Sequence, residues 1–179
     1  MDSSMQQDDA PIRARKDDKE GNLAVVGKSI LINRPRADLF AFWQDFQNLP
    51  AFMENLESIE TLAEGRSRWL IKAPLGRTVA IETEVSEISP DTSISWSSTP
   101  ASEITTRGRV DFADAPSGRG TIVTLEIAYD PPGGDLGRLV AKLFTREPNI
   151  QSRLELKRFK MLMEAGEIAK GPDQLKKDE

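Results

Sequence analysis

The chain has 179 residues and a formal net charge of −5, and it contains no histidine and no cysteine. These absences exclude disulfides, thiol or imidazole nucleophiles and His- or Cys-based metal sites, so catalysis would need carboxylates, lysines, hydroxyls or oriented water. The acidic balance, without a long basic face, argues against nucleic-acid binding, because that binding needs clustered Lys and Arg to neutralise phosphates.

The length predicts a single domain. Residues 1–22 and 169–179 are polar and charged and lack apolar periodicity, so we expect two disordered tails around a folded domain at 23–168. We find no apolar run of about 18 residues and no signal-peptide pattern at the start. We therefore expect a cytoplasmic protein.

The folded region begins with a strand over 25–33, and Pro35 then favours the start of a helix. Apolar residues recur in this helix at the spacing i, i+3, i+4 and i+7, which predicts a core face made of Leu39, Phe42, Trp43 and Phe46. A second short helix should follow, with Asn48 as its cap and Pro50 in its first turn, and should end near Asn55.

Six further strands are predicted from alternating apolar and polar residues between turns with Gly or Pro, at 58–63, 67–73, 77–88, 93–98, 104–112 and 121–129. One face of the sheet should be covered and the other wet. Glu82 and Glu84 then face water. The covered face should carry Trp69, Ile71, Val79, Ile81, Thr83, Val85, Ile94, Trp96, Val110, Phe112, Val123, Leu125, Ile127 and Tyr129.

After the break "DPPGG", helices are predicted at 135–144 and 147–169, since Pro148 suits a first turn. Steps of about 100° per residue give the second helix a solvent face with Arg153, Lys157, Lys160 and Glu164. Its inward side should carry Gln151, Glu155, Arg158 and Leu162. This order of elements, without parallel crossovers, predicts an α+β fold with helices on one face of an antiparallel sheet.

Five segments resemble the START-like (SRPBCC) superfamily, in particular its bacterial polyketide cyclase/dehydrase and coenzyme Q-binding branch: "SILINRP", "ADLFAFWQDFQNLPAFM", "FADAPSGRGT", "YDPPGGDLGRLVAKLF" and "RFKMLMEAGE". Together they span nearly all of 23–167. The resemblance implies a helix-grip fold. In this fold a curved seven-stranded antiparallel sheet wraps around a long C-terminal helix, with two short helices between strands 1 and 2 and a cavity for an apolar ligand.

The expected cavity would lie between the sheet and the terminal helix. Glu155, Arg158 and Gln151 would hold the polar end of a ligand there, or Glu155 and Arg158 simply pair with each other at the helix edge. The aromatic residues would form pocket walls or ordinary core, and Tyr129 could donate a hydrogen bond to a carbonyl. We assign no catalytic residue, metal or cofactor. The expected lining residues are Phe52, Trp69, Ile71, Trp96, Val110, Phe112, Tyr129, Leu136, Leu139, Leu143, Gln151, Glu155, Arg158, Phe159 and Leu162.

The leading hypothesis is binding, transport or sequestration of a small hydrophobic molecule such as a lipid, polyketide or quinone. One alternative is an enzyme that cyclises or dehydrates a polyketide-like substrate, which the lack of histidine disfavours. Another is an interaction module in which helix 135–144 contacts a partner protein or, weakly, a membrane. We interpret that helix as a lid closing one end of the cavity. The sequence leaves open whether the protein is a monomer or a dimer.

Overall fold

The computed structural model describes residues 24–102, 104–130, 133–135, 137–138 and 148–167. The two expected tails and the predicted lid residues Leu136, Leu139 and Leu143 lie outside the described residues. The side chain of Gln151 lies outside them as well.

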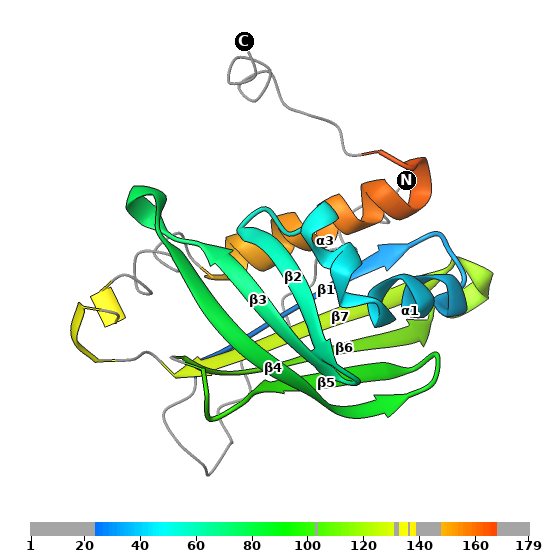
Figure 1. The fold of residues 1–179 in the computed structure, drawn as a ribbon. Helices are drawn as coiled ribbons and strands as arrows, with labels where there is room; N and C mark the ends of the chain where they lie inside the picture. The colour runs from blue at the N-terminus through cyan, green and yellow to red at the C-terminus, as the bar shows by residue number, and fades with distance from the viewer. Residues whose placement is uncertain (1–23, 103, 131–132, 136, 139–147, 168–179) are drawn as a thin grey trace.

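Seven strands form one antiparallel sheet in the order β1-β7-β6-β5-β4-β3-β2 (Figure 1). The strands are β1 (Ala24–Ile32), β2 (Leu56–Ala63), β3 (Arg66–Lys72), β4 (Thr78–Ser89), β5 (Ser93–Ser98), β6 (Thr105–Asp114) and β7 (Thr121–Asp130). The helices are α1 (Arg36–Gln44), the 3₁₀ helices η1 (Phe46–Ala51), η2 (Pro74–Gly76) and η3 (Pro116–Gly118), and α3 (Pro148–Ala165). The predicted helix-grip α+β fold is confirmed.

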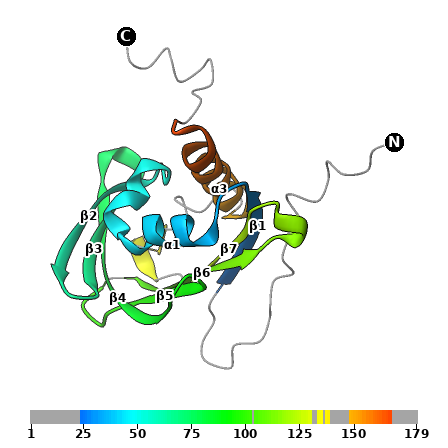
Figure 2. The ribbon, with the colours of Figure 1, turned by 90° about the vertical axis from the view of Figure 1, so that its right-hand side faces the viewer.

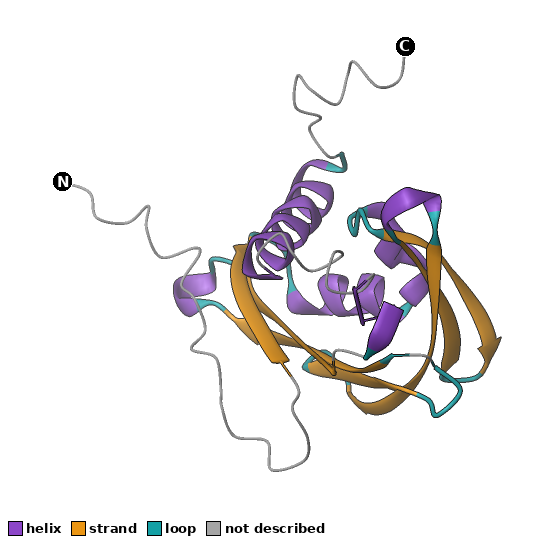
Figure 3. Ribbon diagram, turned by 90° about the vertical axis from the view of Figure 1, so that its left-hand side faces the viewer, coloured by secondary structure: helices purple, strands orange, loops and turns teal. Residues whose placement is uncertain are grey.

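The sheet curves around the helices, with α1 inside the curve and α3 beside β1 (Figures 2 and 3). We call the face turned toward α1 and α3 the inner face. Cross-strand pairing puts Trp69 opposite Ile81 and Val110 opposite Leu125 on this face. The alternation predicted from period two is therefore confirmed, because residues two apart on a strand share a face.

The segment between β1 and β2 differs from the prediction in its second helix. That helix is 3₁₀ and ends at Ala51, and its cap is Asp45, whose carboxylate accepts a hydrogen bond from the backbone N–H of Gln47 at 3.1 Å. The predicted cap, Asn48, instead donates its side-chain amide to the carbonyl of Phe42 at 3.0 Å. Extended backbone at Asp45 separates the two helices and makes this residue the capping position.

The main core packs aromatic rings between α1, η1, the sheet and α3. Phe159 is fully buried, and its ring centroid lies 4.8 Å from that of Phe52 and 5.1 Å from that of Trp43. Phe112 on β6 makes an edge contact with Trp43 at 6.3 Å. A second, smaller buried cluster contains Val79, Ile81 and Ile104, with Ile71 and Ala73 packed against it.

The C-terminal end of α3 is attached to the end of β1, which corrects the predicted solvent face. Lys160 Nζ donates to the carbonyl of Leu31 at 2.8 Å, and a carboxylate oxygen of Glu164 accepts from the backbone N–H of Asn33 at 2.7 Å. The buried stripe of the helix is centred on Phe159 and its neighbours, so the helix is rotated and these two side chains meet β1 instead of open solvent.

Candidate functional site

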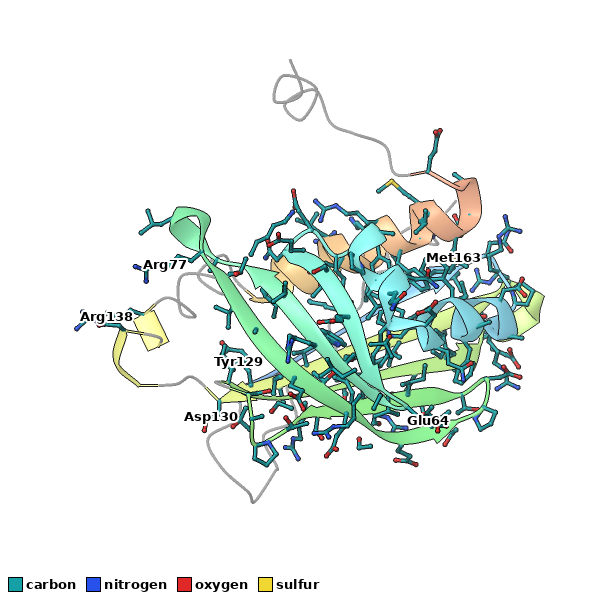
Figure 4. All side chains as sticks on the ribbon, in the orientation of Figure 1. Glu64, Arg77, Tyr129, Asp130, Arg138 and Met163 are labelled. Carbon is teal, nitrogen blue, oxygen red and sulfur yellow. The ribbon has the colours of Figure 1, made fainter. Side chains whose placement is uncertain are left out.

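The candidate site is the inner face of the sheet on the side of Tyr129. Tyr129 and Asp130 lie toward the end of the molecule that carries Arg77 and Arg138, whereas Met163 lies toward the opposite end (Figure 4). We call these the Tyr129 end and the Met163 end. The aromatic core includes Phe159, one helical turn before Met163, and the sheet residues Trp69 and Trp96.

The expected lining residues fall into two groups on the inner face. Four of them are fully buried members of the main core: Phe52, Val110, Phe112 and Phe159. Others are only half-buried although they point inward, namely Ile71 and Tyr129 on the sheet and Leu162 on α3. Trp69 and Trp96 are also buried members of this core and are tilted against each other, with their ring centroids 5.8 Å apart.

The two charged residues expected on α3 have different surroundings. Arg158 forms an ion pair with Glu54, in the loop before β2, with a nitrogen–oxygen distance of 2.9 Å. Glu155 is 7% exposed and therefore a buried carboxyl on the helix. The ion pair with Glu54 joins α3 to the η1–β2 loop, a contact that helical spacing could not reveal.

Hydroxyl side chains on β3 to β6 form a polar strip on the inner face that the sequence analysis missed as a site. The indole N–H of Trp69 donates to Ser67 Oγ at 2.8 Å, and Ser67 Oγ lies 3.0 Å from Thr83 Oγ1. Ser98 Oγ accepts from the backbone N–H of Thr106 at 2.9 Å. The period-two pattern placed Thr83 inward, but only the register between strands shows that these residues are neighbours.

The outer face of the sheet carries the main charge cluster. Arg109 hydrogen-bonds to Asp111 at 2.8 Å, and its pKa is raised by that bond and by the nearby charges of Asp111, Glu87 and Glu126, against an opposing effect of burial. Glu82 faces outward as predicted and pairs with Arg66 at 2.8 Å. These contacts stabilise the sheet and lie on the face away from the candidate site.

Two features are absent from the described ranges: a metal-binding cluster and a membrane-spanning helix. Within them, no group of three or more acidic side chains is arranged to hold a metal ion. None of the described helices combines the length and apolar character needed to cross a bilayer.

Comparison with known proteins gives a family match over most of the folded region. A family model described as "Polyketide cyclase / dehydrase and lipid transport" matches residues 32–151. No curated protein matches the chain.

Several solved structures share the fold. The protein DR_A0006 of Deinococcus radiodurans is 37% identical, with a TM-score of 0.65, and the match covers 80% of this chain and 99% of that one. TTHA0849 of Thermus thermophilus is 24% identical, with a TM-score of 0.60 and coverage of 75% and 92%. A START superfamily protein of Mycobacterium smegmatis is 13% identical, with a TM-score of 0.52 and coverage of 74% and 97%.

The family model covers well over half of the chain, and the curved sheet with its C-terminal helix is the architecture predicted from the resemblance. The chain therefore belongs to the polyketide cyclase/dehydrase and lipid transport family.

Proposed function

We propose that the protein binds a small hydrophobic molecule between the inner face of the sheet and α3, for transport or sequestration. The observation that carries this proposal is the half-buried state of apolar side chains that point inward from the sheet: Ile71, Val85 and Ile127. Residues on the covered face of a sheet are normally buried by the core. Apolar surface that stays accessible to water in the interior favours an apolar ligand.

The proposed ligand lies on the Tyr129 side of the aromatic core. Val85 and Ile127 are half-buried members of the inner face next to Trp96, and Ile71 lies where the two apolar clusters meet. In this arrangement Trp69, Trp96 and Tyr129 form walls of the site. Phe52, Phe112 and Phe159 belong to the packed core beside this site. The contact between the rings of Phe52 and Phe159 helps to hold α3 in place.

A cyclase or dehydrase reaction is the second candidate, and Glu155 is the residue that favours it. A buried carboxyl on the helix that faces the proposed ligand is a candidate general acid or base. Conversion of a bound molecule into a product lighter by one water, followed by mass spectrometry, would establish this reaction. Binding of an unaltered molecule would favour transport or sequestration.

Native mass spectrometry of the gently extracted protein should show a co-purifying hydrophobic molecule. The purified chain should also bind the fluorescent apolar probe N-phenylnaphthylamine. We expect Ile127→Trp to weaken probe binding at least tenfold, because the larger ring fills the space beside the half-buried inner residues. The matched control is Ile122→Trp, on the same strand and half-buried, but on the outer face.

The control variant should bind the probe like the wild type. Both variants are checked for the native fold by circular dichroism and urea unfolding. Equal probe binding by wild-type protein and Ile127→Trp, with both folded, would rule out a ligand at this place.

A further inference from the structure

The turn between β3 and β4 presents a leucine to solvent. Leu75, in η2, is 87% exposed, whereas the other exposed large apolar side chains, Leu62, Ile88 and Leu154, are 39%, 45% and 45% exposed. The φ angle of Leu75 is 63°, in the left-handed region that is unfavourable for a residue with a large side chain. The turn projects beyond the neighbouring strands (Figure 1). We call residues 72–77 the Leu75 tip.

A second hairpin of the same chain shows that this turn does not itself need a leucine. The β3–β4 and β6–β7 turns share the pattern Ala-Pro-x-Gly-Arg, at 73–77 and 115–119. The middle residue has φ 63° and ψ 29° at Leu75, and φ 60° and ψ 29° at Ser117. Serine therefore fits the same backbone. Strained residues are often kept for function, so Leu75 suggests a contact outside its own turn.

The two turns also differ in charge. Lys72 and Arg77 are exposed on the Leu75 tip, and no acidic residue lies between positions 65 and 81. Neither cation has an ion-pair partner within the described part of the chain. In the β6–β7 turn, Asp114 takes the place that corresponds to Lys72. Toward the same end of the molecule as the Leu75 tip, Asp135 is paired with Arg138 at 3.6 Å. The Leu75 tip is therefore a basic projection on an acidic protein.

We propose that the Leu75 tip docks on the surface of a lipid bilayer that contains anionic headgroups. Leu75 enters the boundary between headgroups and acyl chains, and Lys72 and Arg77 contact the headgroup phosphates. Stable protein interfaces need a broad contact area, whereas a single apolar side chain between two cations has the amphipathic character of an interfacial anchor. Salt screens the acidic residues that lie more than about 10 Å away, so the charges of the tip itself dominate near the surface.

This docking site is independent of the proposed ligand. The strands that carry the tip contain Ile71 and Val79, which belong to the smaller apolar cluster beside the proposed ligand site. Arg77 lies at the Tyr129 end of the molecule (Figure 4). A docked tip therefore brings this end to the bilayer. One leucine and two cations give weak binding, so the contact is brief and reversible.

The test is flotation of the full chain with vesicles of phosphatidylcholine, with and without phosphatidylglycerol, at low salt. We expect the wild type to float with vesicles that contain phosphatidylglycerol and to be released at high salt. Leu75→Ser gives the tip the same middle residue as the β6–β7 turn, and it should weaken binding about tenfold or more. Arg77→Gln removes one cation and should weaken binding about fivefold.

Two variants make the same chemical changes elsewhere and serve as controls. Leu62→Ser changes an exposed leucine on β2 next to the β2–β3 turn, at the other end of β3 from the Leu75 tip. Arg119→Gln changes the arginine of the β6–β7 turn. Both should float like the wild type. Leu75→Ser should keep the urea midpoint of the wild type, because a side chain that is 87% exposed packs against little of the protein.

Each remaining outcome counts against the proposal. Equal flotation of Leu75→Ser and Leu62→Ser, with both folded, overturns the role of the tip. Equal flotation with and without phosphatidylglycerol overturns the role of Lys72 and Arg77. No flotation of the wild type overturns the bilayer as partner, and a dimer in sedimentation that Leu75→Ser converts to monomer would assign the tip to a second copy of the chain.

The proposed function is tested separately. Binding of N-phenylnaphthylamine without vesicles should be the same in the wild type and in Leu75→Ser. Weaker probe binding by the folded variant would place Leu75 at the ligand site and overturn its assignment to the bilayer surface.

Discussion

The backbone of Gly108 on β6 lies directly against the indole of Trp96 on β5. A Cβ atom added at Gly108 would lie 2.1 Å from both Cε2 and Cζ2 of Trp96, far inside van der Waals contact. We predict that Gly108→Ala displaces this indole from its place beside Trp69. Overpacking of this kind costs about 1–3 kcal/mol in the free energy of unfolding. Urea unfolding followed by circular dichroism, together with tryptophan fluorescence, measures both effects.

Gly133 provides the matched control for this prediction. No atom lies within 4 Å of a Cβ built there, and its backbone does not require glycine. Gly133→Ala should leave both the stability and the tryptophan spectrum close to those of the wild type. A similar loss of stability in both variants would contradict the steric explanation for Gly108.

Single residues were predictable where their own strand decided the outcome. Period two placed Trp96 and Thr83 on the inner face, and the structure agrees. The need for glycine at 108 was not predictable, because it depends on a tryptophan across the strand pair. The contact between Ser98 and Thr106 was missed for the same reason, since these residues become neighbours only through the register between strands.

Several hydrogen bonds hold the C-terminal end of α3. Arg34 donates to the carbonyl of Met163 at 2.7 Å and to that of Glu164 at 3.2 Å. The last carbonyls of a helix have no partner within the helix, so these bonds fix its final turn on the β1–α1 loop. We predict that Arg34→Ala lowers the free energy of unfolding by about 1 kcal/mol and speeds amide exchange over 160–166. Exchange in β5 should not change.

Arg36, the first residue of α1 and two residues after Arg34, is the control for this prediction. Its ion pair with Asp114 is 3.5 Å long, with 40% and 72% of the two side chains exposed. Such surface pairs contribute about 0–1 kcal/mol, so Arg36→Ala should alter stability little and leave exchange in α3 unaffected. Faster exchange over 160–166 in both variants would argue against a specific anchor at Arg34.

The elements themselves were predicted more reliably than their contacts. Seven strands and the terminal helix follow from alternation, turn residues and Pro148. The predicted orientation of α3 about its axis was wrong. Helical periodicity assigns the most polar face to solvent, whereas Lys160 and Glu164 use their polar groups to bind the end of β1. In the same way, Arg158 was considered with Glu155 on its own helix, and its ion pair with Glu54 crosses to another segment.

At the scale of the molecule, the described residues of the interior form two apolar clusters of unequal size. The main core joins α1, η1, α3 and the sheet, and the smaller one joins Val79 and Ile81 to Ile104 from the β5–β6 connection. The sequence predicted one continuous covered face. The separation of the interior into two clusters depends on the position of Ile104 over the sheet. The alternation pattern of the strands does not specify this position.

This division predicts different costs for equivalent truncations in the two clusters. Ile94 is 1% exposed in the main core and Ile81 is 5% exposed in the smaller cluster. Removing buried methyl groups costs about 2–5 kcal/mol, with the larger values where rigid neighbours cannot close the cavity. We expect a loss of about 4 kcal/mol for Ile94→Ala and about 2 kcal/mol for Ile81→Ala in urea unfolding. Because the smaller cluster borders the proposed ligand site, Ile81→Ala should also speed amide exchange at the ends of β3 and β4 nearest Arg77, and a bound hydrophobic molecule should slow it again. Equal losses of stability, with exchange at these strand ends as slow as in β6, would show that the interior unfolds as a single unit.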